Sequence, residues 1–391
     1  MNKAKVSIVR AHDYDYAEIY AVMKKGIELI GGLAKIVPPG SNVFVKINHL
    51  SSPSPVEKGI VTHPVFVEVV LDLLKAVSAN ITVGDDIQSG TGDGFQISGF
   101  RQMCRRVGVR LINLREIGFV KTACNGHFLE NIYLSKIALD ADVIINLPKL
   151  KTHSLCVLTG GVKNMYGTIP IGLRRKFHGA YIRNEDFSHV VTDIFSAIRP
   201  QLTIMDGIIA MEGEGPSAGS LRRLGIILAS QDAVAIDAVA TKIIGLNPMD
   251  IYTTRYSDER GLGVGDLRNI EVGGGEIDSV LTPAFRPPRV AGLPFSSAIN
   301  TLVKLVPLFL PRLILRKLAI KPSVIEHRCT GCAECKNICP IEAISIHSET
   351  AKIDHNICIE CMCCHEVCRF DAIEPKQSTS GRIIEFLINI F

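Results

Sequence analysis

The 391-residue sequence lacks several features that mark common classes of protein. No apolar run is long enough to span a bilayer. Residues 1–10 contain no apolar signal-peptide core, so we expect a cytoplasmic protein. A net charge of +4 is too small to indicate nucleic acid as a partner. Nucleophile-elbow, P-loop and H-E-x-x-H motifs are also absent, so the sequence carries none of these catalytic signatures.

Cysteine, in contrast, is abundant and clustered. Nine of the twelve cysteines lie between Cys329 and Cys368, which is typical of metal ligation and not of a disulfide framework. Hydrophobic residues make up 47% of the chain, so a sizeable core is available. At roughly 150 residues per domain, this length predicts two or three domains.

Residues 1–278 alternate short apolar runs with helical patterns, which predicts a layered α/β domain with a mainly parallel sheet. The runs are nearly continuously apolar, as in strands buried on both faces. Pro64 suits the first turn of one helix, and Asp232 suits the cap of another that runs toward Gly245. The predicted strands are 6–9, 43–47, 81–83, 109–114, 143–147, 202–205 and 224–228.

Residues 322–376 contain an internal repeat of four spaced cysteines, and a smaller α+β domain is expected there. Three thiolates on one short loop can hold three corners of a cubane cluster, while the fourth points to the other cluster. This rule predicts two [4Fe-4S] clusters with crossed ligand sets. One set is Cys329, Cys332, Cys335 and Cys368, and the other is Cys358, Cys361, Cys364 and Cys339.

This repeat resembles the bacterial-type ferredoxin with two [4Fe-4S] clusters, which implies electron transfer. Arg369 stands where that family usually has proline, and Cys363 is a spare thiol. Two zinc sites are the alternative, since zinc held by four cysteines also uses paired C-x2-C spacing. A purely stabilising pair of clusters is a second alternative.

Between the two domains, residues 279–321 form an apolar and basic segment without Asp or Glu. One interpretation is a linker packed on a domain. The other is a membrane-surface or partner contact through residues 286–321. Residues 377–391 form an apolar tail that could dock on the body or on a partner.

The α/β body resembles the bacterial and archaeal domain-of-unknown-function family 362 over most of residues 40–245. Members of that family are often fused to ferredoxin modules, but the family name implies no established reaction. The resemblance rests on the motifs at 45–48, 62–64, 146–153, 159–167, 206–207 and 212–213.

Polar residues concentrate after the predicted strand 143–147, at the strand end where ligands bind in such sheets. Lys149, Lys151 and His153 share one face of an extended chain. The Gly160-Gly161 turn can direct backbone N–H groups at an anion. Lys163 and Asn164 follow directly, so this stretch predicts a carboxylate or phosphate site. Solvated lysines in a loop are the alternative.

Two other strand ends carry candidate site residues. Lys46 and Asn48 end one strand, and we expect Asp85 or Asp86 to pair with the buried lysine. Asp206 and Glu212 belong to a predicted glycine-rich loop, where they could bind substrate or a divalent metal. A solvated turn is the plainer interpretation of that loop. His178, within a basic loop, is expected to face solvent.

The leading hypothesis is an iron–sulfur oxidoreductase that relays electrons to a small anion or a bound cofactor in the body. Lys151, His153 and Lys163 are the candidate catalytic residues, with His153 or a lysine supplying a proton. A flavin or divalent metal in the body stays open. The alternative is an electron-transfer or assembly protein that docks on a donor or acceptor protein, a partner complex or a membrane. A redox sensor is a third possibility. Oligomeric state and substrate do not follow from the sequence.

Overall fold

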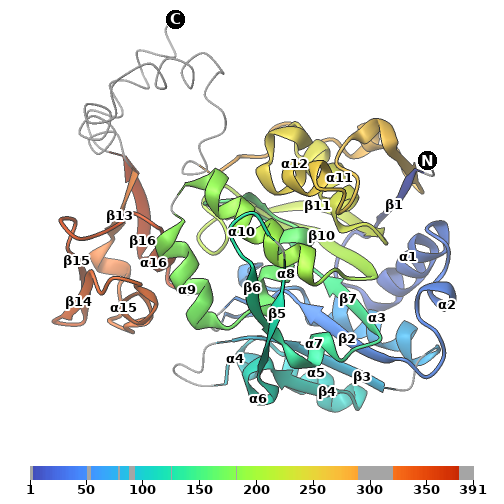
Figure 1. Cartoon of the computed structure of the whole chain (residues 1–391), viewed down its shortest axis with the longest axis horizontal. Coiled ribbons are helices and arrows are strands. Elements are labelled where there is room, and N and C mark those ends of the chain that lie inside the picture. Colours follow the sequence, from blue (N-terminus) through green and yellow to red (C-terminus); the bar gives the residue numbers. More distant parts are fainter. Residues whose placement is uncertain are drawn as a thin grey trace, which may run out of the picture.

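The computed structural model describes residues 3–50, 54–77, 80–87, 93–124, 126–181, 183–288 and 320–377 (Figure 1). Residues 289–319 and 378–391 lie outside this range, and with them most of the predicted basic linker and apolar tail. Within the described ranges, no helix is long and apolar enough to cross a membrane.

One ten-stranded sheet organises the body, in the order β12-β1-β11-β10-β7-β2-β3-β4, with β8 and β9 attached beside β10. All seven predicted strands belong to it. The strands are β1 (Ala4–Arg10), β2 (Asn42–Ile47), β3 (Asn80–Asp85), β4 (Arg110–Asn113), β7 (Val143–Leu147), β8 (Lys149–His153), β9 (Val157–Thr159), β10 (Leu202–Glu212), β11 (Ser220–Ser230) and β12 (Ile270–Gly273).

The sheet is mainly parallel, as predicted. Strands β10, β7, β2, β3 and β4 are parallel neighbours, whereas β11 runs antiparallel to both β10 and β1. One part of the prediction is wrong: residues 206–212 continue β10 and are not a loop. The reason is a long hairpin with β11, which an irregularity between Gly207 and Ile209 bends without ending the pairing.

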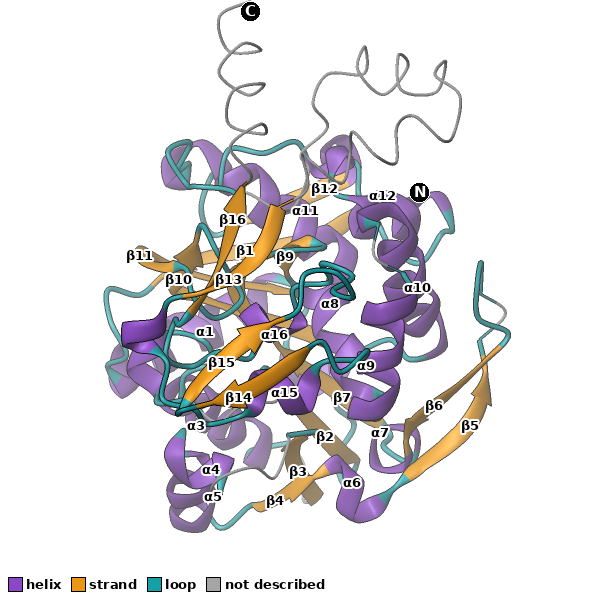
Figure 2. Cartoon of the chain, turned by 90° about the vertical axis from the view of Figure 1, so that its left-hand side faces the viewer, coloured by secondary structure: helices purple, strands orange, loops and turns teal. Residues whose placement is uncertain are grey.

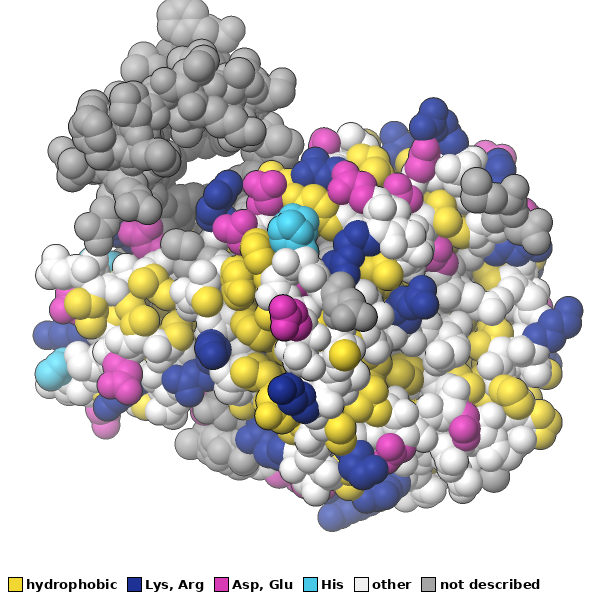
Figure 3. Space-filling model, viewed as in Figure 1, with side chains coloured by type: hydrophobic (Ala, Val, Ile, Leu, Met, Phe, Trp, Pro, Cys, Tyr) yellow, Lys and Arg dark blue, Asp and Glu magenta, His cyan; other side chains and the backbone are white. Residues whose placement is uncertain are grey.

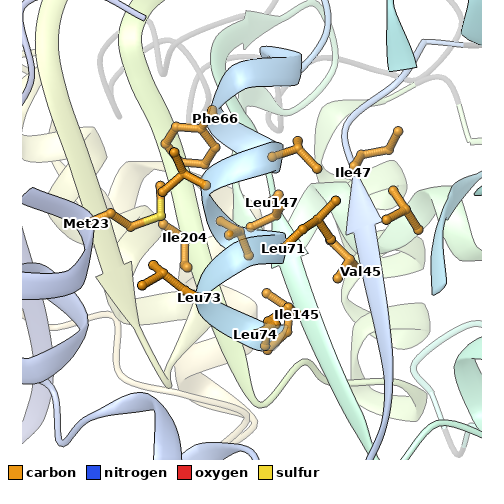
Figure 4. Packing of buried hydrophobic residues seen from close by; sticks show 14 of the residues in the cluster. Met23, Val45, Ile47, Phe66, Leu71, Leu73, Leu74, Ile145, Leu147 and Ile204 are labelled. Carbon is orange, nitrogen blue, oxygen red and sulfur yellow. The ribbon is translucent and has the colours of Figure 1, made fainter. Parts of the chain in front are cut away.

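Helices cover both faces of this sheet because alternate strand residues point to opposite sides. Val45 packs with helices α1 and α3, as Figure 4 shows, whereas its neighbour Phe44 joins the core beneath α8 and α10. The helices are α1 (Tyr16–Leu29), α2 (Leu33–Ile36), α3 (Pro64–Lys75), α4 (Gly94–Ile97), α5 (Phe100–Val107), α6 (Leu114–Ile117), α7 (Lys136–Leu139), α8 (Gly161–Met165), α9 (Ile171–Ala180), α10 (Asn184–Ala197), α11 (Ala233–Ile243) and α12 (Tyr252–Glu259).

Local signals set the helix ends that the sequence predicts. Pro64 opens α3, and the Asp232 side chain accepts hydrogen bonds from the first amides of α11. Gly245 follows that helix with φ of 83°. A hairpin that was not predicted, β5 (Phe119–Ala123) with β6 (Asn131–Ser135), projects from the body (Figure 2).

The C-terminal domain repeats one small unit twice. Strand β13 (Ile320–Val324) pairs with β16 (Ile373–Gln377), and β14 (Ile344–His347) pairs with β15 (Thr350–Ile353). Short helices α15 (Glu334–Ile338) and α16 (Cys363–Glu366) follow the two cysteine loops. The strands of this domain face the viewer in Figure 2.

Helix α9 is the main contact between the body and the C-terminal domain (Figure 1). The Arg175 guanidinium donates hydrogen bonds to the carbonyl oxygens of Ile338 and Cys339, each at 3.1 Å. A Cβ on Gly179 would come within 3.1 Å of Pro340, so the helix approaches the domain closely. The Ser217 hydroxyl donates to the carbonyl of His365 at 3.0 Å. The two domains therefore form a tightly packed interface.

Candidate functional site

A cavity of about 100 Å³ lies at the junction of the two domains. Most of its wall comes from the carboxyl ends of β2 and β8 and from helices α8 and α9 of the body. The C-terminal domain closes it with Ile338, Cys363 and Val367. We call it the interdomain cavity.

Six of the predicted site residues meet in the wall of this cavity: Lys46, Asn48, Lys151, His153, Lys163 and Asn164. They come from segments up to about a hundred residues apart, which parallel pairing brings to the same sheet edge. Sequence reasoning missed other lining residues, among them Arg174, Arg175, Tyr166 and Gly167.

Lys46 is buried and forms an ion pair with Asp85, with 2.8 Å between Nζ and Oδ2. The sequence offered Asp85 or Asp86, and the structure selects Asp85. Burial lowers the pKa of Lys46, and the Asp85 carboxylate opposes that effect. Gly167 lies directly against the pair, because a Cβ there would be 2.8 Å from Nζ of Lys46. This glycine therefore permits the close approach of α8 and its following turn.

Three buried asparagines form a hydrogen-bonded chain beside the ion pair. The Asn146 amide donates to the carbonyl of Gly161 at 2.9 Å, which fixes its orientation because a carbonyl can only accept. Asn164 then donates to Asn146, and Asn48 donates to Asn164, both at 2.8 Å. The side-chain oxygen of Asn48, at the cavity end, has no partner among the described residues.

Two buried histidines occupy the same cavity wall. The Nδ1 atom of His153 accepts from the amides of Leu155 and Cys156, at 3.1 and 3.3 Å, so a neutral ring carries its proton on Nε2. Burial and then the charge of Lys163 lower the pKa of His153 well below its usual range. His178 was expected to face solvent. That expectation is wrong, because α9 turns it inward against Phe187 and into the cavity wall.

Positive charge dominates the cavity. Five lysine and arginine side chains line it, and Asp85 is the one carboxylate among the described lining residues. The Lys163 ammonium lies 4.4 Å from the ring centroid of Tyr166. Figure 3 shows basic and acidic side chains interspersed on the visible surface. The charge of the cavity is instead internal, because Lys46 and Lys151 are buried.

Three other predicted residues form ion pairs that do not line this cavity. Lys149 lies 2.8 Å from Asp206, and its ammonium also contacts the Tyr14 hydroxyl at 2.5 Å. Burial lowers the pKa of Lys149, and Asp206 opposes the shift. Glu212 pairs with Arg286 at 2.9 Å. Lys149, Asp206 and Glu212 therefore hold neighbouring segments together.

The Gly160-Gly161 turn does bind an anion, but that anion belongs to the chain itself. The buried Asp237 carboxylate accepts from the amides of Gly161 and Val162, at 2.5 and 3.0 Å. A Cβ on Gly160 would lie 2.2 Å from the same carboxylate. Burial raises the pKa of Asp237 to about 7, against the effect of the two amides. The prediction that this turn binds substrate is corrected accordingly.

In the C-terminal domain, Cys329, Cys332, Cys335 and Cys368 together line a small apolar cavity of about 20 Å³. They are one of the two predicted crossed sets, and we call them the outer set. The amide of Ala372 donates to the Cys368 sulfur at 3.2 Å. Burial, and next the charges of Cys332 and Cys368, raise the pKa of Cys335 to about 12. Crowded thiolates of this kind require a compensating cation, which iron would supply.

The second set, Cys358, Cys361, Cys364 and Cys339, lies nearer the body, and we call it the inner set. Burial and then the charges of Cys361 and Cys358 raise the pKa of Cys364 well above its usual range, with Cys339 also contributing. The amide of Ala343 donates to the Cys339 sulfur at 3.2 Å. Cys363, the spare thiol, instead lines the interdomain cavity.

Comparison with known proteins agrees with this division of the chain. The C-terminal region is 39% identical over 68 residues to a ferredoxin of Alicyclobacillus acidocaldarius, which covers 17% of this chain and 87% of that protein. It also matches one component of the H2:CoB–CoM heterodisulfide, ferredoxin reductase of Methanothermobacter marburgensis, at 36% identity over 18% of this chain and 13% of that component. The protein is therefore an iron–sulfur protein of the electron-transfer class with a ferredoxin domain.

The body identifies the family. Residues 43–242 match the family described as domain of unknown function (DUF362), and the chain belongs to it. A thylakoid-associated protein of Synechocystis is 32% identical over 259 residues, which covers 66% of this chain and 79% of that protein.

Proposed function

We propose that this protein binds two [4Fe-4S] clusters and transfers electrons between a redox partner protein and a small anion held in the interdomain cavity. The inner and outer cysteine sets would each hold one cluster, and the clusters would supply single electrons. The observation that carries the proposal is that both domains wall the same cationic cavity.

The inner set is the one placed next to the cavity. Arg175 lines the cavity and donates to the carbonyl of Cys339, an inner-set ligand. Ile338 and Cys363, neighbours of inner-set cysteines, form part of the cavity wall. The outer set would therefore exchange electrons with the partner, and the inner set with the bound anion.

The cavity suits a small anion better than a larger cofactor. Its volume of about 100 Å³ corresponds to roughly three water molecules. Ligand pockets for drug-sized molecules are about 300 Å³ or more, so a flavin or nicotinamide would not fit. A divalent metal is also disfavoured, because the lining carboxylate of Asp85 already pairs with Lys46.

Lys151 and Lys163 would hold the anion by charge. His153 is neutral at physiological pH and carries its proton on Nε2, so it would donate a hydrogen bond or a proton as negative charge builds on the bound molecule.

The test uses anaerobically purified full-length protein, photoreduced and mixed with a panel of small carboxylates and oxyanions. We expect about eight irons per chain and reoxidation of the clusters by at least one of these anions. Lys151→Met and Lys163→Met should abolish that reoxidation while retaining the iron. Lys136→Met, on the surface, is the matched control and should behave as wild type.

Reoxidation that is unchanged in both cavity variants would contradict the site. If no anion in the panel reoxidises the clusters but a redox partner protein does, the protein would be an electron carrier without substrate chemistry of its own. Zinc in place of iron would contradict the whole proposal.

A further inference from the structure

We infer that the anion bound in the interdomain cavity carries its own hydrogen-bond donor, such as the hydroxyl of a small hydroxycarboxylate, and that Asn48 recognises this donor. The inference rests on the proposed anion site and names the chemical class of its ligand. It follows from one buried atom, the side-chain oxygen of Asn48.

The orientation of the Asn48 amide is determined by its neighbours. The chain that begins at the Gly161 carbonyl requires Asn146, Asn164 and Asn48 each to donate through nitrogen to the previous residue. Turning the Asn48 amide over would place two oxygens against each other. Its oxygen is therefore fixed as an acceptor.

This acceptor is buried at the cavity and has no donor among the residues that the structure describes. Asn48 is 9% exposed and lines the cavity. A buried acceptor without a partner is costly, so a ligand that supplies a donor gains from satisfying it. The lysines and arginines in the same wall are donors, which suit only the anionic part of a ligand.

Thr159 supports the same assignment from the opposite strand. Its hydroxyl is buried, lines the cavity and also has no described partner. A hydroxyl both donates and accepts, so it can hydrogen-bond to a ligand oxygen or to a ligand hydroxyl. The cavity thus combines cationic donors for the charged end of a ligand with an acceptor for a donor on the same molecule.

Acetate and glycolate form the matched pair of probes, because they differ by one hydroxyl group. Binding is measured by calorimetry on the oxidised, cluster-containing full chain. Wild type should bind glycolate about tenfold more tightly than acetate, the effect of one buried hydrogen bond. Asn48→Ala should remove this preference, and Asn48→Asp, which keeps an oxygen, should retain the preference while weakening both anions through its charge.

Asn113→Ala is the control. Asn113 is also buried with an unpartnered side-chain oxygen, but it does not line the cavity, so the tenfold preference should persist. Equal affinity of wild type for both anions would overturn this inference and leave the anion site standing. A preference that survives in Asn48→Ala would also overturn it. Failure of wild type to bind either anion would overturn the proposed anion site as well.

Discussion

Arg175 offers the most specific test of how the body and the clusters are coupled. Its guanidinium donates to the carbonyls of Ile338 and Cys339, at the inner cysteine set. A positive charge at this position favours the reduced form of the nearby cluster, because reduction adds negative charge. Arg175→Ala should therefore make the reduction potential of the inner cluster more negative.

The size of the shift follows from Coulomb's law. At roughly 8 Å and an effective dielectric constant of about 20, one charge contributes about 2 kcal/mol, or about 90 mV for one electron. Arg175 is partly exposed, so solvent and salt should reduce the shift to about half of that value.

The assay is an anaerobic redox titration followed by electron paramagnetic resonance, which follows both clusters. We expect one potential to fall by roughly 40 mV in Arg175→Ala and the other to change little. Arg175→Lys, which keeps the charge, should lie near wild type. Arg183→Ala removes an arginine whose side chain is 72% exposed and should change neither potential. A shift to more positive potential, or equal shifts of both clusters, would refute the reasoning.

Three further predictions concern the supports of the site. A Cβ at Gly167 would crowd the Lys46–Asp85 pair, so Gly167→Ala should lower the free energy of unfolding in urea by about 1–3 kcal/mol. Gly172→Ala, where a Cβ meets nothing within 4 Å, should not lower it, and equal losses would contradict the crowding. Asp237 keeps a proton in the folded protein up to a pKa of about 7, but releases it near 3.8 when unfolded. Its contribution to stability is therefore complete below that lower value and is lost as pH rises toward about 7, at about 1.4 kcal/mol per pH unit. Denaturation across this range should show the slope in wild type but not in Asp237→Asn, and an unchanged slope in the variant would count against the raised pKa. Cys335→Ser should lower the iron content from about eight to about four per chain, whereas Cys363→Ser should retain all of it; iron loss in Cys363→Ser would reassign the ligands.

The features that the sequence predicted are those that local patterns determine. Buried parallel strands are continuously apolar, and so all seven were identified. The cysteine repeat predicted the crossed sets, because cluster geometry fixes the spacing of its ligands. The spacing of Lys151 and His153 likewise placed two residues of the cavity wall.

The errors arose where a distant segment decides the outcome. Nothing near Gly161 in the sequence shows that Asp237, from another helix, binds its amide. His178 looks solvent-facing in a basic stretch, and only the packing of α9 against Phe187 buries it. Arg175 is one of two adjacent arginines, and its role becomes visible only when the C-terminal domain is in place.

The most direct test of the central claim is to ask whether a ligand in the interdomain cavity lies beside a reduced cluster. Deuterated acetate is added to the anaerobically reduced protein, and electron–nuclear double resonance is recorded on the cluster signals. The account predicts a deuterium coupling to one cluster that disappears in Lys163→Met. Acetate that binds wild type without any coupling to either cluster would contradict it.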